Sequence, residues 1–204
     1  MTGEPMQNST EKWEGGFTLV ELLIAMALAL VVITSLSSAF ISQRKTYGVQ
    51  EQICEMMQGT RATMDIISRE VKMAGYDPTG AGIVGIPYSA TQLEIRADLN
   101  GDGDTADPNE TIIYTENGGK IERQDGVGTP VTLAENIPSG TFGFTYWEGD
   151  GATEVELPAN EGNIRQVDIT ITARTSKPDP GYGLNSGYRN YTLSSYVTPR
   201  NLGL

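Results

Sequence analysis

Acidic and amide side chains alternate in one short stretch of this 204-residue chain. Asp98, Asn100 and Asp102 take every second position, and Gly103 follows directly. Calcium prefers six to eight oxygen ligands, and an EF-hand loop supplies them from positions 1, 3 and 5 with a glycine at position 6. The spacing therefore predicts a calcium loop. The oxygen ligands expected in it are Asp98, Asn100, Asp102, Asp104, Asp107 and Glu110.

The second half of this loop departs from the EF-hand pattern. Position 12, where a bidentate glutamate belongs, is Asn109, and Glu110 comes one residue later. The flanking segments 92–97 and 111–116 alternate like strands rather than helices. We therefore expect a calcium-stabilised connection between two strands. The alternative is an acidic, solvated turn that is held by Asx hydrogen bonds and needs no metal.

One carboxylate, Glu21, lies near the start of a segment, residues 17–41, that carries no other charge. The segment exceeds the roughly 20 apolar residues that span a bilayer, so it predicts a membrane helix. A charge at mid-bilayer costs roughly 2.5–3.5 kcal/mol, which makes Glu21 a candidate functional residue. The alternatives are an ordinary signal peptide, a plain anchor and the core helix of a soluble protein.

The composition excludes several classes of function. A formal net charge of −12 argues against nucleic-acid binding by a broad basic patch. The chain has no histidine, and so lacks the commonest general base and transition-metal ligand. Cys54 is the single cysteine, so neither an internal disulfide nor a cysteine zinc cluster can form, and we expect it to be a small packing group. An enzyme is the least supported class.

The membrane helix is expected to continue as an amphipathic helix. Gly75 and then Pro78 predict its end, so the whole helix should cover residues 17–74. Gly48 and Gly59 lie inside it as points where it could bend. A narrow apolar stripe with alternating spacings of four and three residues should pack on a sheet. Its members are Ile53, Met57, Thr60, Met64, Ile67, Val71 and Ala74.

Alternating β-branched residues and turn residues follow the helix and predict an antiparallel sheet, hence an α+β protein. A tight hairpin turn is expected at Asn117-Gly118-Gly119. Residues 149–163 and 176–187 are predicted to be long loops. The predicted strands are 92–97, 111–116, 120–123, 141–148, 166–174 and 191–197.

The stretch Gly15-Gly16-Phe17-Thr18-Leu19-Val20-Glu21 resembles the class III signal of type IV pilins and pseudopilins. This resemblance implies that prepilin peptidase cleaves between Gly16 and Phe17, that Phe17 is then N-methylated, and that Glu21 acts in filament assembly. It implies a type IV pilin fold, in which the antiparallel sheet covers the second half of the long helix. The domains implied are a leader (1–16), a transmembrane and assembly helix (17–41), its amphipathic continuation (42–75) and a β-sheet domain (76–204).

Two further segments indicate a type within that family. The segments 44–50 and 69–76, the latter Arg-Glu-Val-Lys-Met-Ala-Gly-Tyr, resemble W-type minor pilins, as does the ending at 196–202. The same helix end is similar to J-type pseudopilins of type II secretion. The resemblance therefore implies a minor pilin that helps to initiate or cap a type IV pilus, with a J-type pseudopilin as the alternative. A major pilin is less favoured, because this chain cannot form a C-terminal disulfide loop.

A different class of function is a calcium-stabilised tip adhesin or binding module. The aromatic side chains that could form its binding surface are Tyr146, Trp147, Tyr182, Tyr188 and Tyr191, although packing on the sheet is the simpler expectation for them. The discriminating observation is whether the β-sheet domain binds host or matrix ligands.

The resemblance also implies partners and a location. The partners are prepilin peptidase, other minor and major pilins through the N-terminal helix, the inner-membrane assembly machinery and membrane lipid. Before assembly the chain would cross the inner membrane once, with its globular domain in the periplasm, and it would then join a pilus or pseudopilus at the cell surface. Glu21 would face the Phe17 ammonium of a neighbouring subunit and set the register. The alternative is an unpaired Glu21 that snorkels to the interface.

Overall fold

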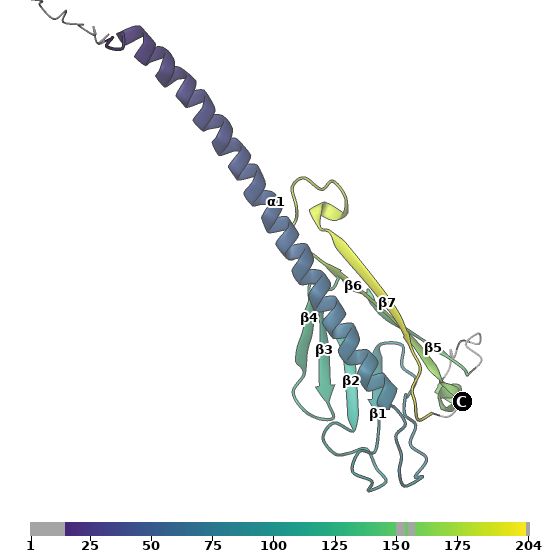
Figure 1. The fold of residues 1–204 in the computed structure, drawn as a ribbon. Helices are drawn as coiled ribbons and strands as arrows, with labels where there is room; N and C mark the ends of the chain where they lie inside the picture. The colour runs from purple at the N-terminus through teal and green to yellow at the C-terminus, as the bar shows by residue number, and fades with distance from the viewer. Residues whose placement is uncertain (1–14, 150–153, 155–157, 203–204) are drawn as a thin grey trace, which may run out of the picture. The chain divides into compact units, whose positions relative to one another are not determined.

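The computed structural model describes residues 15–149, 154 and 158–202. They form one long helix, α1 (Leu19–Met73), followed by antiparallel strands, so the α+β prediction is confirmed (Figure 1). The chain divides into two compact units, Met1–Gly48 and Val49–Leu204. The first contains the apolar part of α1, and the second contains the rest of α1 and both sheets. Most of the predicted leader, residues 1–14, lies outside the described residues.

The end of α1 depends on a glycine. Gly75 has a φ of +72°, a left-handed conformation that favours glycine, and its N–H donates to the Arg96 carbonyl at 2.9 Å. A Cβ at this position would come within 2.1 Å of the Leu202 side chain. The helix therefore stops one residue before the predicted end.

Within the second unit, α1 buries one stripe against the sheets. Thr60, Met64, Ile67 and Val71 are buried, as the spacing predicted. Thr63 is buried as well, and its hydroxyl donates to the carbonyl of Leu133 at 3.3 Å. The prediction for Cys54 was wrong, because this residue is exposed. It lies beside the stripe rather than on it, so it does not pack on the sheets of the described structure.

The first sheet has the strand order β1-β2-β3-β4 and is antiparallel throughout. The hairpin turn between β2 and β3 is confirmed, with positive φ at Gly118 and Gly119. The prediction missed β4, because only Ala134 of that strand is buried and its alternation is therefore weak. The strands are β1 (Gln92–Arg96), β2 (Thr111–Asn117), β3 (Lys120–Asp125) and β4 (Val131–Glu135).

The second sheet consists of β5 (Phe142–Trp147), β6 (Gln166–Arg174) and β7 (Asn190–Val197), in that order. A single sheet was predicted, and the structure shows two. The ladder ends at Glu135, where Asn136 takes a φ of +60° and Pro138 follows, so the chain leaves the first sheet there. The Glu116 carboxylate accepts hydrogen bonds from the N–H groups of residues 140–142 and so ties the crossing segment to the first sheet.

Both predicted loops contain a short 3-10 helix, η1 (Pro158–Asn163) and η2 (Asn185–Gly187). Part of the first loop, residues 150–153 and 155–157, lies outside the described residues. The second loop is held by an ion pair between Arg189 and Asp179 at 2.8 Å. Hydrogen bonds from Arg189 lower the pKa of Asp179. The N–H of Lys177 fastens the loop to α1 by donating to the Gln52 side chain at 2.9 Å.

Candidate functional site

The predicted cleavage bond lies outside the helix. Residues 15–18 have no regular structure, and α1 begins only at Leu19. Gly16 is exposed, and the Phe17 side chain is 89% exposed. The Gly16–Phe17 bond is therefore exposed and lies before the first turn of the helix.

Thr18 and Glu21 cap the first turn reciprocally. The Thr18 hydroxyl accepts the N–H of Glu21 at 3.2 Å, and the Glu21 Oε2 accepts both the N–H and the hydroxyl of Thr18 at 2.9 Å. This is a capping box, in which each residue satisfies a donor that the helix leaves unpaired. Sequence reasoning missed it, although the Thr-x-x-Glu signature was present. Among the described residues, no hydrogen bond reaches the Glu21 Oε1.

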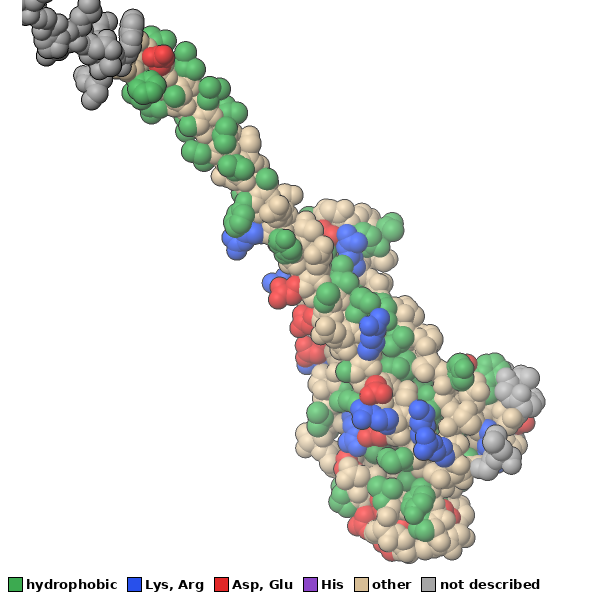
Figure 2. Space-filling model, viewed as in Figure 1, with side chains coloured by type: hydrophobic (Ala, Val, Ile, Leu, Met, Phe, Trp, Pro, Cys, Tyr) green, Lys and Arg blue, Asp and Glu red, His purple; other side chains and the backbone are tan. Residues whose placement is uncertain are grey.

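The apolar part of α1 exposes its side chains on every face. None of the large hydrophobic residues from Leu19 to Ile41 is buried, and Figure 2 shows them along the helix. By length and composition α1 can cross a membrane. Thr34, Ser35 and Ser38 donate to the carbonyls four residues earlier, at 2.7–3.0 Å. Those bonds satisfy the hydroxyls without water.

A family model described as the prokaryotic N-terminal methylation motif matches residues 14–37. This chain carries that methylation motif. The matched segment contains the exposed Gly16–Phe17 bond, the capping box and the start of the apolar helix. It implies processing by prepilin peptidase and pilin-type assembly partners.

Among solved structures, the chain is similar to a type IV-like pilin from Thermus thermophilus. The two are 16% identical, and the match covers 72% of this chain and 98% of that one, with a TM-score of 0.44. None of the curated proteins matches this sequence.

The acidic loop that follows β1 is anchored by two buried carboxylates. Asp98, which is fully buried, accepts the N–H groups of Gly101 and Gly103 at 2.6 and 3.0 Å. Glu110, 2% exposed, accepts the N–H groups of Leu99, Asn100 and Asp107. These hydrogen bonds fix the backbone of the loop, and those of Asp98 are of the Asx type that the metal-free alternative predicts.

Three of the predicted ligands lie together in this loop. Oxygen atoms of Asp102, Asp107 and Glu110 lie within 4.8 Å of one another. The Asn100 amide donates to Asp102 at 3.1 Å and to Asp107 at 2.6 Å. Desolvation and the carboxylates of Asp102 and Glu110 raise the pKa of Asp107. Asp104 is not in this group; its carboxylate accepts the N–H of Ala106.

The carboxylate oxygens of this group are ligands of the kind that a hard cation such as calcium prefers. Three carboxylates place oxygens within 4.8 Å of one another, and desolvation, followed by the charges of Asp102 and Glu110, raises the pKa of Asp107. Calcium would draw its oxygens from Asp102, Asp107 and Glu110, and it would offset their negative charge. Asp98 would act through the backbone turn that it holds. The calcium site stays a prediction.

A group of three polar side chains joins α1 to the first sheet. Glu70, on α1, accepts a hydrogen bond from the hydroxyl of Tyr114 on β2 and is 3.0 Å from a guanidinium nitrogen of Arg123 on β3. Burial and the Glu70 carboxylate raise the pKa of Tyr114. Sequence analysis noted Glu70 only as part of the helix-end pattern. Its partners Tyr114 and Arg123 lie far along the chain, so no local sequence pattern indicated that they contact Glu70.

Most of the aromatic residues proposed for a binding surface are engaged in packing. Tyr146 is 3% exposed, and its hydroxyl donates to the Ser89 carbonyl at 3.1 Å. Guanidinium groups lie over three of the other rings: Arg189 over Tyr182, Arg174 over Tyr188 and Arg61 over Tyr191. Among the described residues, these rings do not form one free aromatic platform.

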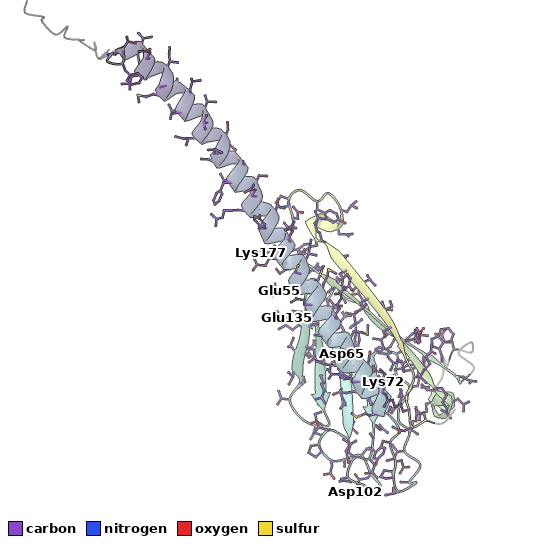
Figure 3. The ribbon with its side chains drawn as sticks, viewed as in Figure 1. Glu55, Asp65, Lys72, Asp102, Glu135 and Lys177 are labelled. Carbon is purple, nitrogen blue, oxygen red and sulfur yellow. The ribbon has the colours of Figure 1, made fainter. Side chains whose placement is uncertain are left out.

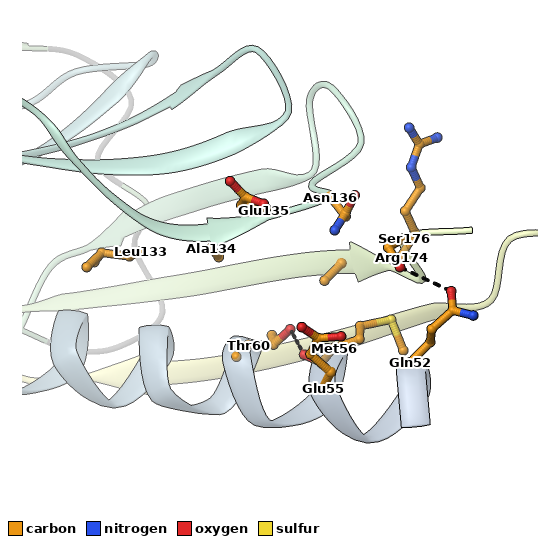
Figure 4. Close-up of a pocket in the computed structure, with 12 residues that line it drawn as sticks. Gln52, Glu55, Met56, Thr60, Leu133, Ala134, Glu135, Asn136, Arg174 and Ser176 are labelled. Carbon is orange, nitrogen blue, oxygen red and sulfur yellow. Dashed lines mark hydrogen bonds between the residues drawn. The ribbon is translucent and has the colours of Figure 1, made fainter. Parts of the chain in front are cut away.

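A hollow of about 300 Å³ lies between α1 and the ends of β4 and β6 (Figure 4). Gly59, Ala134 and Ala173 leave space in its floor because their side chains are small or absent. Glu55 and Glu135 lie on its α1 and β4 walls, respectively. Its described lining contains no nucleophile paired with a base.

Proposed function

We propose that this chain is a type IV pilin-like subunit and, more specifically, a minor pilin that helps to initiate or cap a pilus. The observation that carries the proposal is the methylation motif at residues 14–37, which places an exposed, non-helical Gly16–Phe17 bond directly before an apolar helix. Prepilin peptidase would cut this bond and leave an ammonium group on Phe17. The finer assignment rests on the resemblance of the helix end and of the chain ending to W-type minor pilins.

Glu21 would link one subunit to the next. Its Oε2 is held by Thr18 on its own chain, and its Oε1 can accept the Phe17 ammonium of a neighbouring subunit. Opposite charges in a low-dielectric environment attract strongly, and removal of one partner leaves the other uncompensated. Glu21 would therefore fix the axial register. The subunit would wait in the inner membrane with its second unit in the periplasm.

The deciding experiment is mass spectrometry of the mature N-terminus, on chain recovered from a bacterial membrane that contains its prepilin peptidase. A first peptide that begins at methylated Phe17 is the expected result. Retention of Met1, or a cut near Ala27, would overturn the proposal. A minor pilin should then be recovered in sheared pili, whereas a J-type pseudopilin should depend on type II secretion components.

We also propose that the acidic loop binds calcium through Asp102, Asp107 and Glu110, the three carboxylates that converge within 4.8 Å. Calorimetric titration of the full chain in detergent should give saturable heat with calcium. The variant Asp102→Asn/Asp107→Asn should lose it, and Asp104→Asn should keep it because Asp104 lies outside the group. Equal binding by the first variant and the unaltered chain would overturn the assignment.

A further inference from the structure

The two sheets of the second unit have four edge strands, and three of these have partners along their outer sides. On β1, the Arg96 N–H donates to the carbonyl of Gly85 at 2.8 Å. On β4, the Leu133 carbonyl accepts a hydrogen bond from the Thr63 hydroxyl of α1. On β5, an isolated bridge forms at Trp147. An uncovered strand edge pairs readily with another chain, so natural proteins cover or interrupt such edges.

The fourth edge strand, β7, has neither a cover nor an interruption. Its 8 residues pair with β6 in one continuous register. The strand, Asn190–Val197, contains no proline, no glycine and no charged residue, which are the devices that usually protect an edge. Among the described residues, no hydrogen bond reaches the outer backbone groups of β7.

The hydrogen bonds of β6 show which groups of β7 point outward. The Thr172 N–H donates toward β5, to the Thr141 carbonyl at 3.1 Å, so the even-numbered residues of β6 bond on that side. The odd-numbered residues of β6 therefore bond to β7, where their partners are also odd-numbered. The outward N–H and C=O groups of β7 belong to the even-numbered residues, whose side chains are all exposed. These are Asn190, Thr192, Ser194 and Tyr196.

Two contacts hold a stretch of α1 beside β7. Arg61 donates to the hydroxyl of Tyr191 at 3.4 Å, and the Arg200 N–H donates to the Lys72 carbonyl at 3.1 Å. Figure 3 places Asp65 and Lys72 on this stretch of the helix. From Arg61 to Lys72 the helix rises by roughly 17 Å, a length that about five residues of an extended strand would match.

This flank of α1 is basic. Arg61, Lys72 and Arg200 form no ion pair with a described carboxylate. The acidic side chain between them, Asp65, is already paired with Arg69 at 2.9 Å. In a chain with a net charge of −12, the flank is a local excess of positive charge beside an open strand edge.

We propose that β7 accepts an additional antiparallel strand from a different protein, an extended segment with acidic side chains at alternate positions. Its backbone pairs with the outward groups of Thr192, Ser194 and Tyr196, and its carboxylates face the basic flank of α1. A second copy of β7 does not supply this segment, because Asn190–Val197 carries no charge. The inference goes beyond the proposed function and does not depend on cleavage before Phe17.

The exposed face of the sheet does not select a charge in the added strand. Beside β7 on that face, β6 carries one charge of each sign, with Asp168 opposite Tyr196 and Arg174 opposite Asn190. The small hydroxyl side chains between them bond in pairs across the two strands, as Thr170 does with Ser194 at 2.9 Å. The segment should therefore carry small polar residues on this face and its carboxylates on the other.

Hydrogen exchange tests the open edge in the unaltered chain. With the full chain in detergent micelles, the amides of Thr192, Ser194 and Tyr196 should exchange at least tenfold faster than those of Leu193 and Ser195. The probe is an eight-residue peptide of alternating threonine and glutamate, capped at both ends. It should slow the three outward amides at least tenfold. Exchange that does not alternate, or no slowing at millimolar peptide, would overturn the proposal.

Modified peptides separate backbone pairing from simple charge attraction. In an antiparallel pair, the threonines of the probe direct their N–H groups toward β7 and the glutamates direct theirs away. N-methylation of the threonines should therefore weaken binding at least tenfold, measured by fluorescence anisotropy, whereas N-methylation of the glutamates is the matched control. A peptide of alternating threonine and lysine should bind at least fivefold more weakly. Equal binding by the two methylated peptides would overturn strand addition.

Substitutions in the chain provide the last test. Ser194→Pro removes one outward N–H at a position where an edge strand tolerates proline, and it should weaken peptide binding at least tenfold. Ser194→Ala keeps that N–H and should bind within about twofold of the unaltered chain. If thermal unfolding shows that the proline variant does not fold, Arg61→Glu/Lys72→Glu decides instead. That double variant should lose its preference for the acidic peptide over the basic one, and an unchanged preference would contradict the proposal.

Discussion

Glu21 and Glu70 are both carboxylates on α1, and they show how one helix meets two environments. Glu21 lies where the surrounding apolar side chains are exposed, and within residues 15–149, 154 and 158–202 its side chain bonds only to Thr18. Glu70 lies where α1 is packed, and Tyr114 and Arg123 satisfy it from two strands. The difference indicates that the first part of α1 is made for partners outside the chain, whereas the second is completed by the chain itself.

The largest expected effect is on assembly. Glu21→Ala should leave cleavage at Gly16 intact and reduce filament incorporation by more than tenfold, because a neighbouring ammonium loses its counter-charge. Glu21→Gln sharpens the test: its side chain can still cap Thr18 but carries no charge. Incorporation is measured in sheared pili against total membrane chain. Normal incorporation of the alanine variant would refute the role of Glu21 in setting the register.

Loss of Glu70 should destabilise the second unit. Glu70→Ala leaves the guanidinium of Arg123 and the buried Tyr114 hydroxyl unpaired, and we expect the free energy of unfolding to fall by about 3 kcal/mol. Denaturant titration of the full chain in micelles measures it. Asp65→Ala, which breaks the exposed Asp65–Arg69 pair, is the control and should cost less than about 1 kcal/mol. Equal effects of both variants would show that Glu70 does not dock the helix.

Calcium binding tests the cluster of carboxylates that Asp102, Asp107 and Glu110 form in the acidic loop. At about 100 times the dissociation constant, bound calcium should stabilise the fold by about 2.7 kcal/mol relative to chelator. Thermal unfolding with and without calcium shows the shift, and magnesium at equal concentration controls for ionic strength. No shift at millimolar calcium would leave the loop as a metal-free turn anchored by Asp98 and Glu110.

Removal of the helix cap should have a smaller effect, confined to the first turn. Thr18→Val keeps the shape of the side chain but loses the acceptor for the Glu21 N–H, at a cost of about 1 kcal/mol. Hydrogen exchange at Glu21 should quicken about fivefold, while Thr18→Ser should preserve protection. Quickened exchange throughout the second unit would contradict a local cap.

The smallest expected effect is on the stability of the fold at low pH, and it depends on the carboxylate of Asp77. Asp77 accepts four backbone N–H groups from residues 80–83, and these bonds outweigh desolvation and lower its pKa from 3.8 to about 2. A lowered folded-state pKa gives stability that is present above pH 3.8 and lost as the pH falls toward 2. Stability of Asp77→Asn should therefore depend less on pH in this window. An unchanged slope would rule Asp77 out as a contributor.

The sequence predicted what is local and periodic. The stripe through Met64, Ile67 and Val71 gave the helix face, Gly75 gave its end, and the alternation in β6 gave a strand with the observed bounds. The matched methylation motif lies where the resemblance placed it. These features are fixed by residues within a few positions of one another.

What the sequence missed depends on distant residues. β4 is a strand because β3 supplies its ladder, and the segment that leads to the second sheet is tied to the first by Glu116, which accepts the N–H groups of residues 140–142. Likewise, the spacing that suggested Asp98 as a ligand could not show that its oxygens are taken by Gly101 and Gly103. No periodicity in the sequence records such pairings.

The last described residues close the end of α1. Arg200 donates its N–H to the Lys72 carbonyl, the Asn201 side chain donates to the Met73 carbonyl, and Leu202 packs over Gly75. These contacts join the last described residues to the middle of the chain, since α1 ends 128 residues before Asn201. A chain that lacks residues 200–202 would keep the Gly75 bond to the Arg96 carbonyl but would leave the carbonyls of Lys72 and Met73 without these donors.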